Sequence, residues 1–455
     1  MSSFAIAGCE VRRLLRDRAL PALLILLLGL SAYAAWNGAD WVQEREAAIG
    51  LIKAADQAWL TGDGRHFVAQ SYPSVILPIT QPVLAPTAMA PLSVGQADAY
   101  PFTAETFPLG DYTYLFRRVW ADIGSPTVRA AGRFDLAFVV VFLLPLVILA
   151  TTYDLWSGER ERGVAAMVLS QPVAVGPVIA VKALARGLVV LLPSTAVILA
   201  VAAWAGAREP IGLMALALSV LAYGGFWLAI AVIISLVARR STEAAIAAGA
   251  VWLLVVVMTP SLSLAAVDLA APAPSEMRFA TDLKARTTEM TERQRLYREA
   301  NPTPVRVPAP RIPDRLRDVY ADRVALDREL APMIAAHQQA RDARRHLLDT
   351  MRFFLPSVAV QDALDRIAGS DADRALAFES QARTAQLELR LMFKSYLDRD
   401  ALVTLAEYDN MPGFQFRESG GAFQAGVLAD LAALVVATLL ILVAARALRG
   451  QAVVL

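Results

Sequence analysis

The chain has 455 residues, of which 56% are hydrophobic and only 19% are charged, and this balance lies outside the range of soluble globular proteins. Its 43 lysines and arginines are matched by 42 aspartates and glutamates, so no basic excess indicates a nucleic-acid-binding protein. One cysteine, Cys9, excludes an intrachain disulfide, and three scattered histidines give no metal-site pattern. We therefore expect a membrane protein that binds no metal.

Residues 1–18 are predicted to form an amphipathic helix that lies in the membrane interface. Apolar residues recur at helical spacing from Phe4 to Leu15, whereas Arg12, Arg13 and Arg16 take another face. A positively charged flank would explain the arginines, but it would not explain the apolar stripe.

Six stretches contain the roughly 20 mainly apolar residues that a membrane-spanning helix needs. They are residues 19–36, 134–152, 178–204, 211–237, 244–267 and 422–445. The first stretch continues into "SAYAAW", which resembles a signal-peptidase site. The long arginine-rich lead favours a retained anchor over cleavage.

The arginines beside the short connections predict the orientation of these spans. Arginines precede the first span, at Arg12, Arg13, Arg16 and Arg18. Others lie in the connection between the fourth and fifth spans, at Arg239 and Arg240, and after the sixth span, at Arg446 and Arg449. By the positive-inside rule, both termini, the tail 446–455 and residues 153–177 are expected to be cytoplasmic.

Two large segments, residues 37–133 and 268–421, then fall on the extracytoplasmic side. The first is rich in proline, which predicts extended segments and turns with some helix at residues 41–60.

The second segment is expected to form a helical domain. Helices are predicted at residues 276–300, 315–348 and 355–396, with a break at "NPTPVRVPAPRIP". Their apolar positions should pack into one bundle, at Val360, Leu364, Ile367, Leu387, Leu389, Leu391 and Phe393. Phe414 and Phe416 are expected at the lipid headgroups, ahead of the last span.

A charged segment, "SGERERGVAAMVLSQPV", directly follows the second span. It predicts a short helix with a charged first turn and an apolar remainder, which ends at Pro172. Its physical chemistry is equally compatible with a helix that enters a groove on a soluble partner and with a solvated loop. The chain has no phosphate-binding G-x-x-x-x-G-K-[ST] loop, so we do not expect it to hydrolyse nucleotide by itself.

This segment resembles the E-R-E-x-G-T-L…L-L-S-x-P signature of ABC-2 type permeases, the membrane subunits of a class of ATP-binding cassette transporters. The matching positions are Glu159, Arg160, Glu161, Gly163, Leu169, Ser170 and Pro172, with Lys182 at the place of the lysine that commonly follows. The sequence departs from the signature at Val164, Ala165 and Val181. The segments "PLSVGQADAYP", "GRFDLAFVVVFLLPL" and "FLPSVAVQDALDRIAGSDADRALAFESQ" are similar to a branch of these permeases with large inserts after the first and fifth spans.

The resemblance covers the whole chain and implies an all-α, six-span fold like that of type V exporters, in the bacterial inner membrane. It implies that residues 153–177 form a coupling helix, in which Glu159 to Gly163 (with Arg162), Leu169 and Pro172 contact a separate ATPase subunit. ATP and Mg would then bind that ATPase subunit, and this chain would bind no cofactor. Two permease halves are required, so the partners would include a second copy or a homologous permease, as well as membrane lipids.

Ionisable residues inside the spans are candidates for function because each is costly unless it is paired or solvated. Lys182 and Arg186 lie four residues apart near the cytoplasmic end of the third span, where we expect them to reach lipid headgroups. Asp430 lies about two turns inside the sixth span, which suggests a pathway or interhelical role. Asp135 and Asp268 are explained by their places at span ends.

Three functions are compatible with these features. The first is the permease subunit of an ATP-driven exporter or extractor. The second is mechanotransmission, in which the outer domains move against a periplasmic partner and no cargo passes. The third is an ion-coupled transporter that uses Asp430 and Lys182, but it lacks repeated broken helices and leaves the charged segment unexplained.

Overall fold

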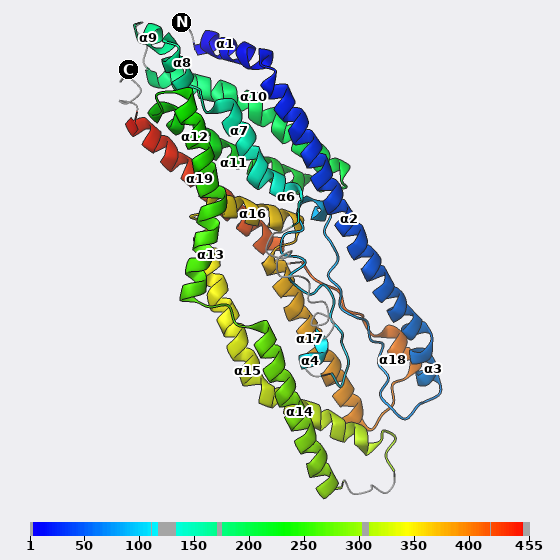
Figure 1. Ribbon diagram of the computed structural model, residues 1–455. Helices are drawn as coiled ribbons and strands as arrows, with labels where there is room; N and C mark the ends of the chain where they lie inside the picture. Colours follow the sequence, from blue (N-terminus) through cyan, green and yellow to red (C-terminus); the bar gives the residue numbers. More distant parts are fainter. Residues whose placement is uncertain are drawn as a thin grey trace.

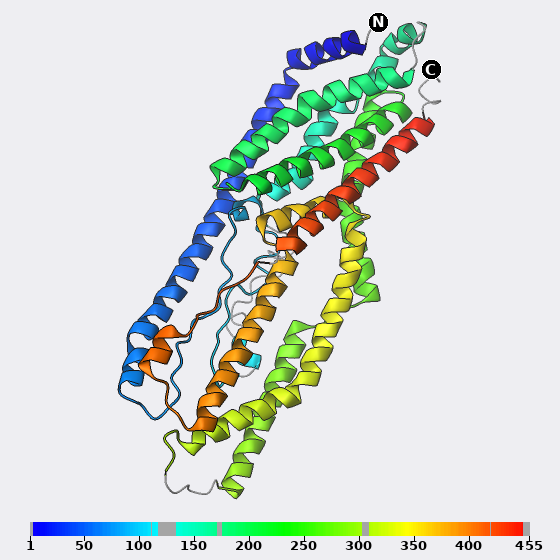
Figure 2. The ribbon, with the colours of Figure 1, turned by 180° about the vertical axis from the view of Figure 1, so that it is seen from behind.

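The structure is a computed structural model that describes residues 3–110, 112–116, 133–170, 175–302, 309–418 and 420–448. Within these ranges the regular structure is helical, and the one β contact is an isolated bridge between Val83 and Thr103. Figures 1 and 2 show a bundle of helices that carries both chain termini, continued by an elongated outer region. We call the two ends the termini side and the outer side.

The prediction of six spans is confirmed, since six stretches in the described residues are long and apolar enough to cross a membrane. They comprise α2 (Ala19–Thr61), α6–η2–α7 (Leu136–Phe138, Val139–Leu143 and Leu144–Thr152), α10 (Val175–Trp204), α11 (Pro210–Val237), α12–η3–α13 (Ser241–Trp252, Leu253–Met258 and Thr259–Ala270) and α19 (Gly420–Ala447). The amphipathic lead forms α1 (Ser3–Arg16), which packs against α10.

Helix α11 is the centre of the bundle. Its apolar window is 67% buried, against 11% for the α12–α13 span and 17% for α19. Inside the core Tyr223 stacks on Phe226, and Trp227 contacts both rings edge-to-face; such aromatic pairs add to the energy of area burial. The last two spans therefore leave most of their apolar surface outside the core of this chain.

Prolines lie within three of the spans, as the sequence indicates. Pro145 and Pro260 each follow a π-helical turn, η2 and η3, and Pro193 lies inside the continuous helix α10. A proline cannot donate to the preceding turn and its ring crowds that turn, so a wider turn accommodates it. The wider turns occur in the second and fifth spans.

The helix that contains the first span is much longer than the predicted span of residues 19–36. Helix α2 continues without a break to Thr61, so residues 41–60 are helical as expected but belong to the same rod. No proline follows Trp36 within the helix, the Asn37-Gly38 pair does not interrupt it, and the charged residues that follow suit a solvated helix. The rod therefore joins the bundle to α3 (Asp63–Ala69) and α18 (Leu405–Asn410) on the outer side (Figure 1).

The outer side is built from α2 and the helices α3 (Asp63–Ala69), α14 (Glu276–Ala300), α15 (Asp314–Arg352), α17 (Ala372–Arg399) and α18 (Leu405–Asn410), with short turns η1 (Ala90–Leu92) and α4 (Tyr112–Leu115) in the extended chain between α3 and the second span. Leu389 and Phe393 pack in a cluster with Val68 and Tyr408 from α3 and α18. The proline-rich segment thus runs between two helical walls (Figure 2).

The predicted helix at residues 355–396 is wrong in one respect, because it is two helices. Helix α16 (Pro356–Ala368) ends at Gly369, whose φ of +71° is left-handed, and Asp371 then caps α17 by accepting from the Arg374 amide. A glycine followed by a capping aspartate was the sequence signal for this break.

Helix α16 does not belong to the outer bundle either. Its apolar residues Val360, Leu364 and Ile367 lie in the core of the membrane bundle, where α16 crosses beneath α11 and α19 (Figure 1). A strongly apolar stripe on a 13-residue helix fits both locations by periodicity alone. Helix α16 therefore connects the outer side to the membrane-spanning helices.

Two further apolar predictions are corrected. Leu387 and Leu391 remain 55% and 54% exposed instead of packing in the outer bundle. Phe414 and Phe416 contact Phe378 of α17 at ring-centroid distances of 6.2 and 6.1 Å, so they pack on the outer domain rather than serving as headgroup anchors.

Candidate coupling segment and ionic networks

The charged segment forms two short helices on the termini side, α8 (Ser157–Glu161) and α9 (Val164–Leu169). Gly163 joins them with a φ of +72°, a conformation that other residues adopt only at a cost. The glycine of the motif therefore sets the angle between α8 and α9.

Glu159 points into the protein rather than toward a partner. It is 6% exposed and forms an ion pair with Lys182 of α10. The expectation that Glu159 lies on an outward coupling surface, and that Lys182 reaches lipid headgroups, is therefore wrong for this structure. A carboxylate so close to an apolar core is stabilised only by such a partner, which the linear sequence places 23 residues away.

The other motif residues attach α8 to the connection between α11 and α12. Arg160 donates to the carbonyl oxygens of Leu236 and Ala238 at 3.1 and 3.0 Å. Glu161 accepts from the Ser241 amide at 3.0 Å, whereas the bond from Arg162 Nε to the Gly158 carbonyl, at 2.8 Å, lies within the segment. Most of the charged motif thus holds the segment to the bundle.

The surface that faces away from the bundle is apolar and lies on α9. Met167 is 70% exposed and Val164 is 42% exposed, whereas Ala165 is buried against Trp156 and Leu155. Leu169 ends α9, and Pro172 lies outside the described residues. Exposed methionine is common on surfaces that bind protein partners because its side chain adapts in shape.

Arg186 is also buried, at 2% exposure, which contradicts its predicted position at the headgroups. Its Nε donates to Glu10 of α1 at 2.5 Å, and its Nη1 donates to Asp154 at 2.7 Å and to the Thr151 carbonyl at 3.2 Å. This arginine joins the amphipathic helix, the end of the second span and α10 at one point.

Asp430 of the sixth span is fully buried and faces charged residues of α15 and α16. Arg352 Nε of α15 lies 3.2 Å from one carboxylate oxygen and Arg366 Nε of α16 lies 3.9 Å from the other. Both arginines also bond Asp362, each at 2.7 Å. Of the two roles considered for Asp430, the geometry supports the interhelical one.

A second buried carboxylate pair escaped the sequence analysis. Ser93 Oγ donates to Asp365 of α16 at 2.7 Å and lies 3.4 Å from Asp135, which also caps α6 by accepting from the Phe138 amide. Burial raises the pKa of Asp365 to about 8, and the nearby charge of Asp135 adds to this increase. No motif marked Asp365, because the cluster brings together three distant parts of the chain.

Asp268, the other span-end aspartate, pairs with Arg344 of α15 at 2.6 Å. It thereby ties the end of α13 to the outer domain. Within the described residues, no group of three or more histidine, cysteine or acidic side chains is arranged to hold a metal ion.

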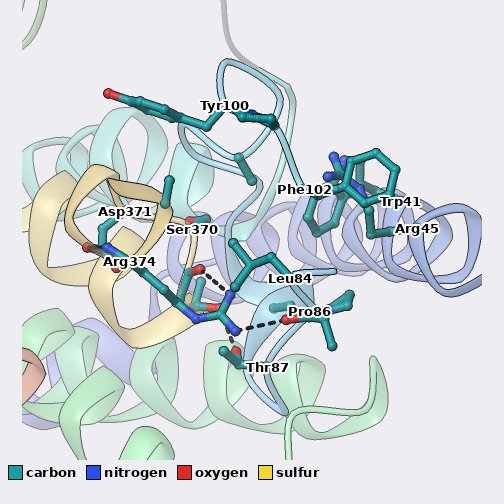
Figure 3. Close-up of a pocket in the computed structure, with 17 residues that line it drawn as sticks. Trp41, Arg45, Leu84, Pro86, Thr87, Tyr100, Phe102, Ser370, Asp371 and Arg374 are labelled. Atoms are coloured by element: carbon teal, nitrogen blue, oxygen red, sulfur yellow. Dashed lines mark hydrogen bonds between the residues drawn. The ribbon is translucent and has the colours of Figure 1, made fainter. Parts of the chain in front are cut away.

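A small pocket lies where α2, the extended chain and α17 meet (Figure 3). The Arg45 guanidinium stacks on Phe102 at 4.0 Å and on Trp41 at 4.8 Å, while Arg374 donates to the carbonyls of Gly369 and Ala85 (Figure 3). Its free volume is about 30 Å³, room for a water-sized molecule only. The pocket is therefore a packed contact between α2, the extended chain and α17.

Comparison with known protein families shows to which family this six-span chain belongs. The sequence model of a family described as "ABC-2 family transporter protein" matches residues 4–449. The chain belongs to the ABC-2 transporter family. Its members are membrane components of transporters rather than catalytic subunits, and they work in general with an ABC ATPase. No curated protein matches this ABC-2 chain.

Proposed function

We propose that this protein is the permease subunit of an ABC transporter and that it couples ATP hydrolysis by a separate ATPase subunit to the export or extraction of a substrate. ATP and Mg bind the ATPase subunit in this proposal. The protein resides in the bacterial inner membrane with both termini cytoplasmic, and it works with a second permease copy or a homologous permease.

The α8–α9 segment carries this proposal. The Glu159–Lys182 ion pair and the hydrogen bonds from Arg160 to the carbonyls of Leu236 and Ala238 hold the segment against the bundle. It presents the exposed apolar face of α9, with Met167 and Val164, on the termini side. A face that is held rigidly on several spans passes the movement of a docked partner to all of them.

Replacing Met167 tests the docking role. Met167→Asp should leave the chain inserted and folded, while it reduces recovery of the complex with the cognate ATPase subunit by about tenfold, because a charge in an apolar contact loses on the order of 1.4 kcal/mol or more. The measurement is co-purification and ATPase stimulation in nanodiscs.

Met277→Asp is a matched control for this experiment. Met277 is 71% exposed, against 70% for Met167, but it lies on α14 of the outer side. Only the Met167 variant should lose the ATPase subunit. Equal recovery of both complexes would mean that α9 is a solvated loop and would remove the main support for the proposal.

The second candidate, mechanotransmission, is favoured by the connections between the spans and the outer side. Helix α2 is one continuous rod, and Asp430 of the sixth span pairs with Arg352 of the outer helix α15 and with Arg366 of the connecting helix α16. Such connections move outer domains when spans move. Transport of a substrate into or out of sealed vesicles distinguishes the candidates, because mechanotransmission requires ATP turnover without any flux.

A further inference from the structure

The outer side contains a cleft that none of the roles above uses. Its volume is about 740 Å³, within the range of about 300–1,000 Å³ that is usual for ligand sites. Helices α15, α16 and α17 form its walls, and Ala273 and Pro274, which directly follow α13, reach its edge. The cleft therefore lies close to the outer end of the fifth span, and Arg366 in its wall faces Asp430 of the sixth span.

Charges of both signs line this cleft in nearly equal number. Five arginines and six carboxylates contribute to its walls. A ligand with only negative charge would meet the carboxylates, and one with only positive charge would meet the arginines. The lining is complementary to a molecule that carries one charge of each sign.

Arg341 and Glu379 are two oppositely charged groups of the lining that lie close enough to interact. Arg341 also bonds the Tyr100 hydroxyl, it lies 3.8 Å from Glu276, which is too far for a hydrogen bond between them, and its side chain is 36% exposed. Glu379 is 7% exposed and accepts from Arg383 at 3.3 Å, and burial raises its pKa. A ligand anion would form a charge-assisted hydrogen bond with Arg341, and a ligand ammonium would form one with Glu379.

The apolar residues of the cleft indicate the rest of the ligand. Leu348, Leu376 and Leu387 contribute to the lining, and Leu348 and Leu387 are 37% and 55% exposed. Leucines exposed beside arginines are unfavourable in water and suit the apolar part of an amphiphile. Because the cleft lies close to the outer end of the fifth span, the nearest zwitterionic amphiphiles are membrane phospholipids.

We propose that this cleft binds a zwitterion composed of a phosphate and an amine, with the phosphate on Arg341 and the amine on Glu379. Phosphatidylethanolamine from the membrane and a soluble glycerophosphodiester share this chemistry. As a substrate site, the cleft deepens the proposed function and rests on it. Ligand binding itself is independent of any ATPase subunit.

The inner wall of the cleft gives the ligand a connection to the sixth span. Asp362 and Arg366 line the cleft, and Arg366 also faces Asp430 of α19. A ligand in the cleft therefore lies beside a guanidinium that Asp430 also faces.

Calorimetric titration of the full chain in detergent tests the site. The probes are dihexanoyl phosphatidylethanolamine, dihexanoyl phosphatidylglycerol, glycerophosphoethanolamine and the dipeptide Gly-Gly. Arg341→Gln and Glu379→Gln should each weaken binding of the first probe by about tenfold or more. The matched controls are Arg328→Gln on α15 and Glu388→Gln on α17, both at exposed positions outside the cleft, which should bind like the parent.

Tighter binding of phosphatidylethanolamine than of glycerophosphoethanolamine would identify the membrane as the source, and equal binding would identify the soluble diester. Equal affinity for phosphatidylglycerol, preference for the dipeptide, or binding unaffected by both site variants would overturn the proposal. Circular dichroism and monodisperse elution establish that each variant is folded, and Arg341→Lys, which keeps the charge, should retain part of the affinity. Binding that persists in a chain without ATPase stimulation would refute the proposed function alone.

Discussion

Buried ionisable side chains in this protein meet partners from distant parts of the sequence. Lys182 meets Glu159, Arg186 meets Glu10 and Asp154, and Asp430 meets one arginine of the outer helix α15 and one of α16. Moving one such charge into an apolar region costs several kcal/mol, so each pair specifies which helices lie together. Individual buried ion pairs therefore specify which helices of the molecule are connected.

The Glu159–Lys182 pair leads to a charge-reversal prediction. Lys182→Glu should strongly reduce folded protein, because two buried carboxylates would face each other and breaking a buried pair costs about 3–5 kcal/mol. The double variant Glu159→Lys with Lys182→Glu should recover much of that loss. Monodisperse yield after solubilisation measures the effect, and Lys284→Glu, at an exposed position, is the neutral control. No recovery in the double variant would show that the pair is not an interaction in the folded chain.

Asp365 predicts a pH dependence of stability. Its pKa rises from 3.8 to about 8 on folding, so the native state keeps a proton that the unfolded chain releases above about pH 4. Its contribution is complete below pH 4 and is lost as the pH rises through 8, by at most about 1.4 kcal/mol per unit. Asp365→Asn cannot ionise and should therefore melt at a higher temperature than the parent above pH 8.

The measurement is thermal unfolding in detergent at a fixed scan rate over about pH 5 to 9. The gain of the asparagine variant should grow with pH, and Asp342→Asn, an exposed aspartate on α15, should show no such trend. Neighbouring charged groups are Asp135 and Asp362, and they remain in both proteins. A constant difference at all pH values would exclude a buried ionisation at Asp365.

At the scale of elements, the break between α16 and α17 depends on Gly369. An added Cβ there would lie 2.3 Å from Thr87 Cγ2, and the φ of +71° disfavours any other residue. Gly369→Ala should therefore destabilise the protein by about 1–3 kcal/mol. Adding Thr87→Ser removes that methyl but keeps the hydroxyl that donates to the Ala368 carbonyl, so it should restore part of the loss.

Thermal unfolding of these variants can be compared with Gly50→Ala, where no atom lies within 4 Å of the added Cβ. The control should be neutral or stabilising because alanine favours a helix. Equal stability of Gly369→Ala and the parent would mean that the left-handed turn is not needed at this position.

The elements show which features sequence reasoning reaches and which it does not. Hydrophobic length gave six spans, and helical spacing gave α1, α14 and α15 with bounds that differ by a few residues. The same spacing could not tell that Val360 and Leu364 pack on α11 and α19, because periodicity reports one apolar face and not its partner.

The helical character of the α8–α9 segment was predicted from the sequence, but the direction of its side chains was not. Glu159 looked like a surface charge because it lies in a run of four charged residues, and its partner Lys182 lies on another helix. The Ser93, Asp135 and Asp365 cluster carried no signal for the same reason, since each residue is unremarkable in its own segment. Tertiary contacts decide both cases.

For the whole molecule, the continuous helix α2 makes the outer side responsive to the bundle. Its 43 residues extend for about 65 Å, while the apolar part of a bilayer is about 30 Å thick, so a large part of the rod lies outside the membrane. A rigid rod turns small rotations of the first span into larger displacements at its outer end. The ion pairs of Asp430 add a second rigid connection, through the sixth span.

This arrangement predicts that the outer sides of two copies move relative to each other during the ATPase cycle. A spin label at position 53, where Lys53 is exposed on the outer half of α2, reports the distance between copies after Cys9→Ser removes the native thiol. The distance distribution should differ between nucleotide-free and nucleotide-trapped complexes. Three glycines inserted into α2 after Trp41 should abolish that difference while ATP hydrolysis continues, because the rod is then interrupted. Identical distributions in the uninterrupted protein would leave the outer side as a static cover over the bundle.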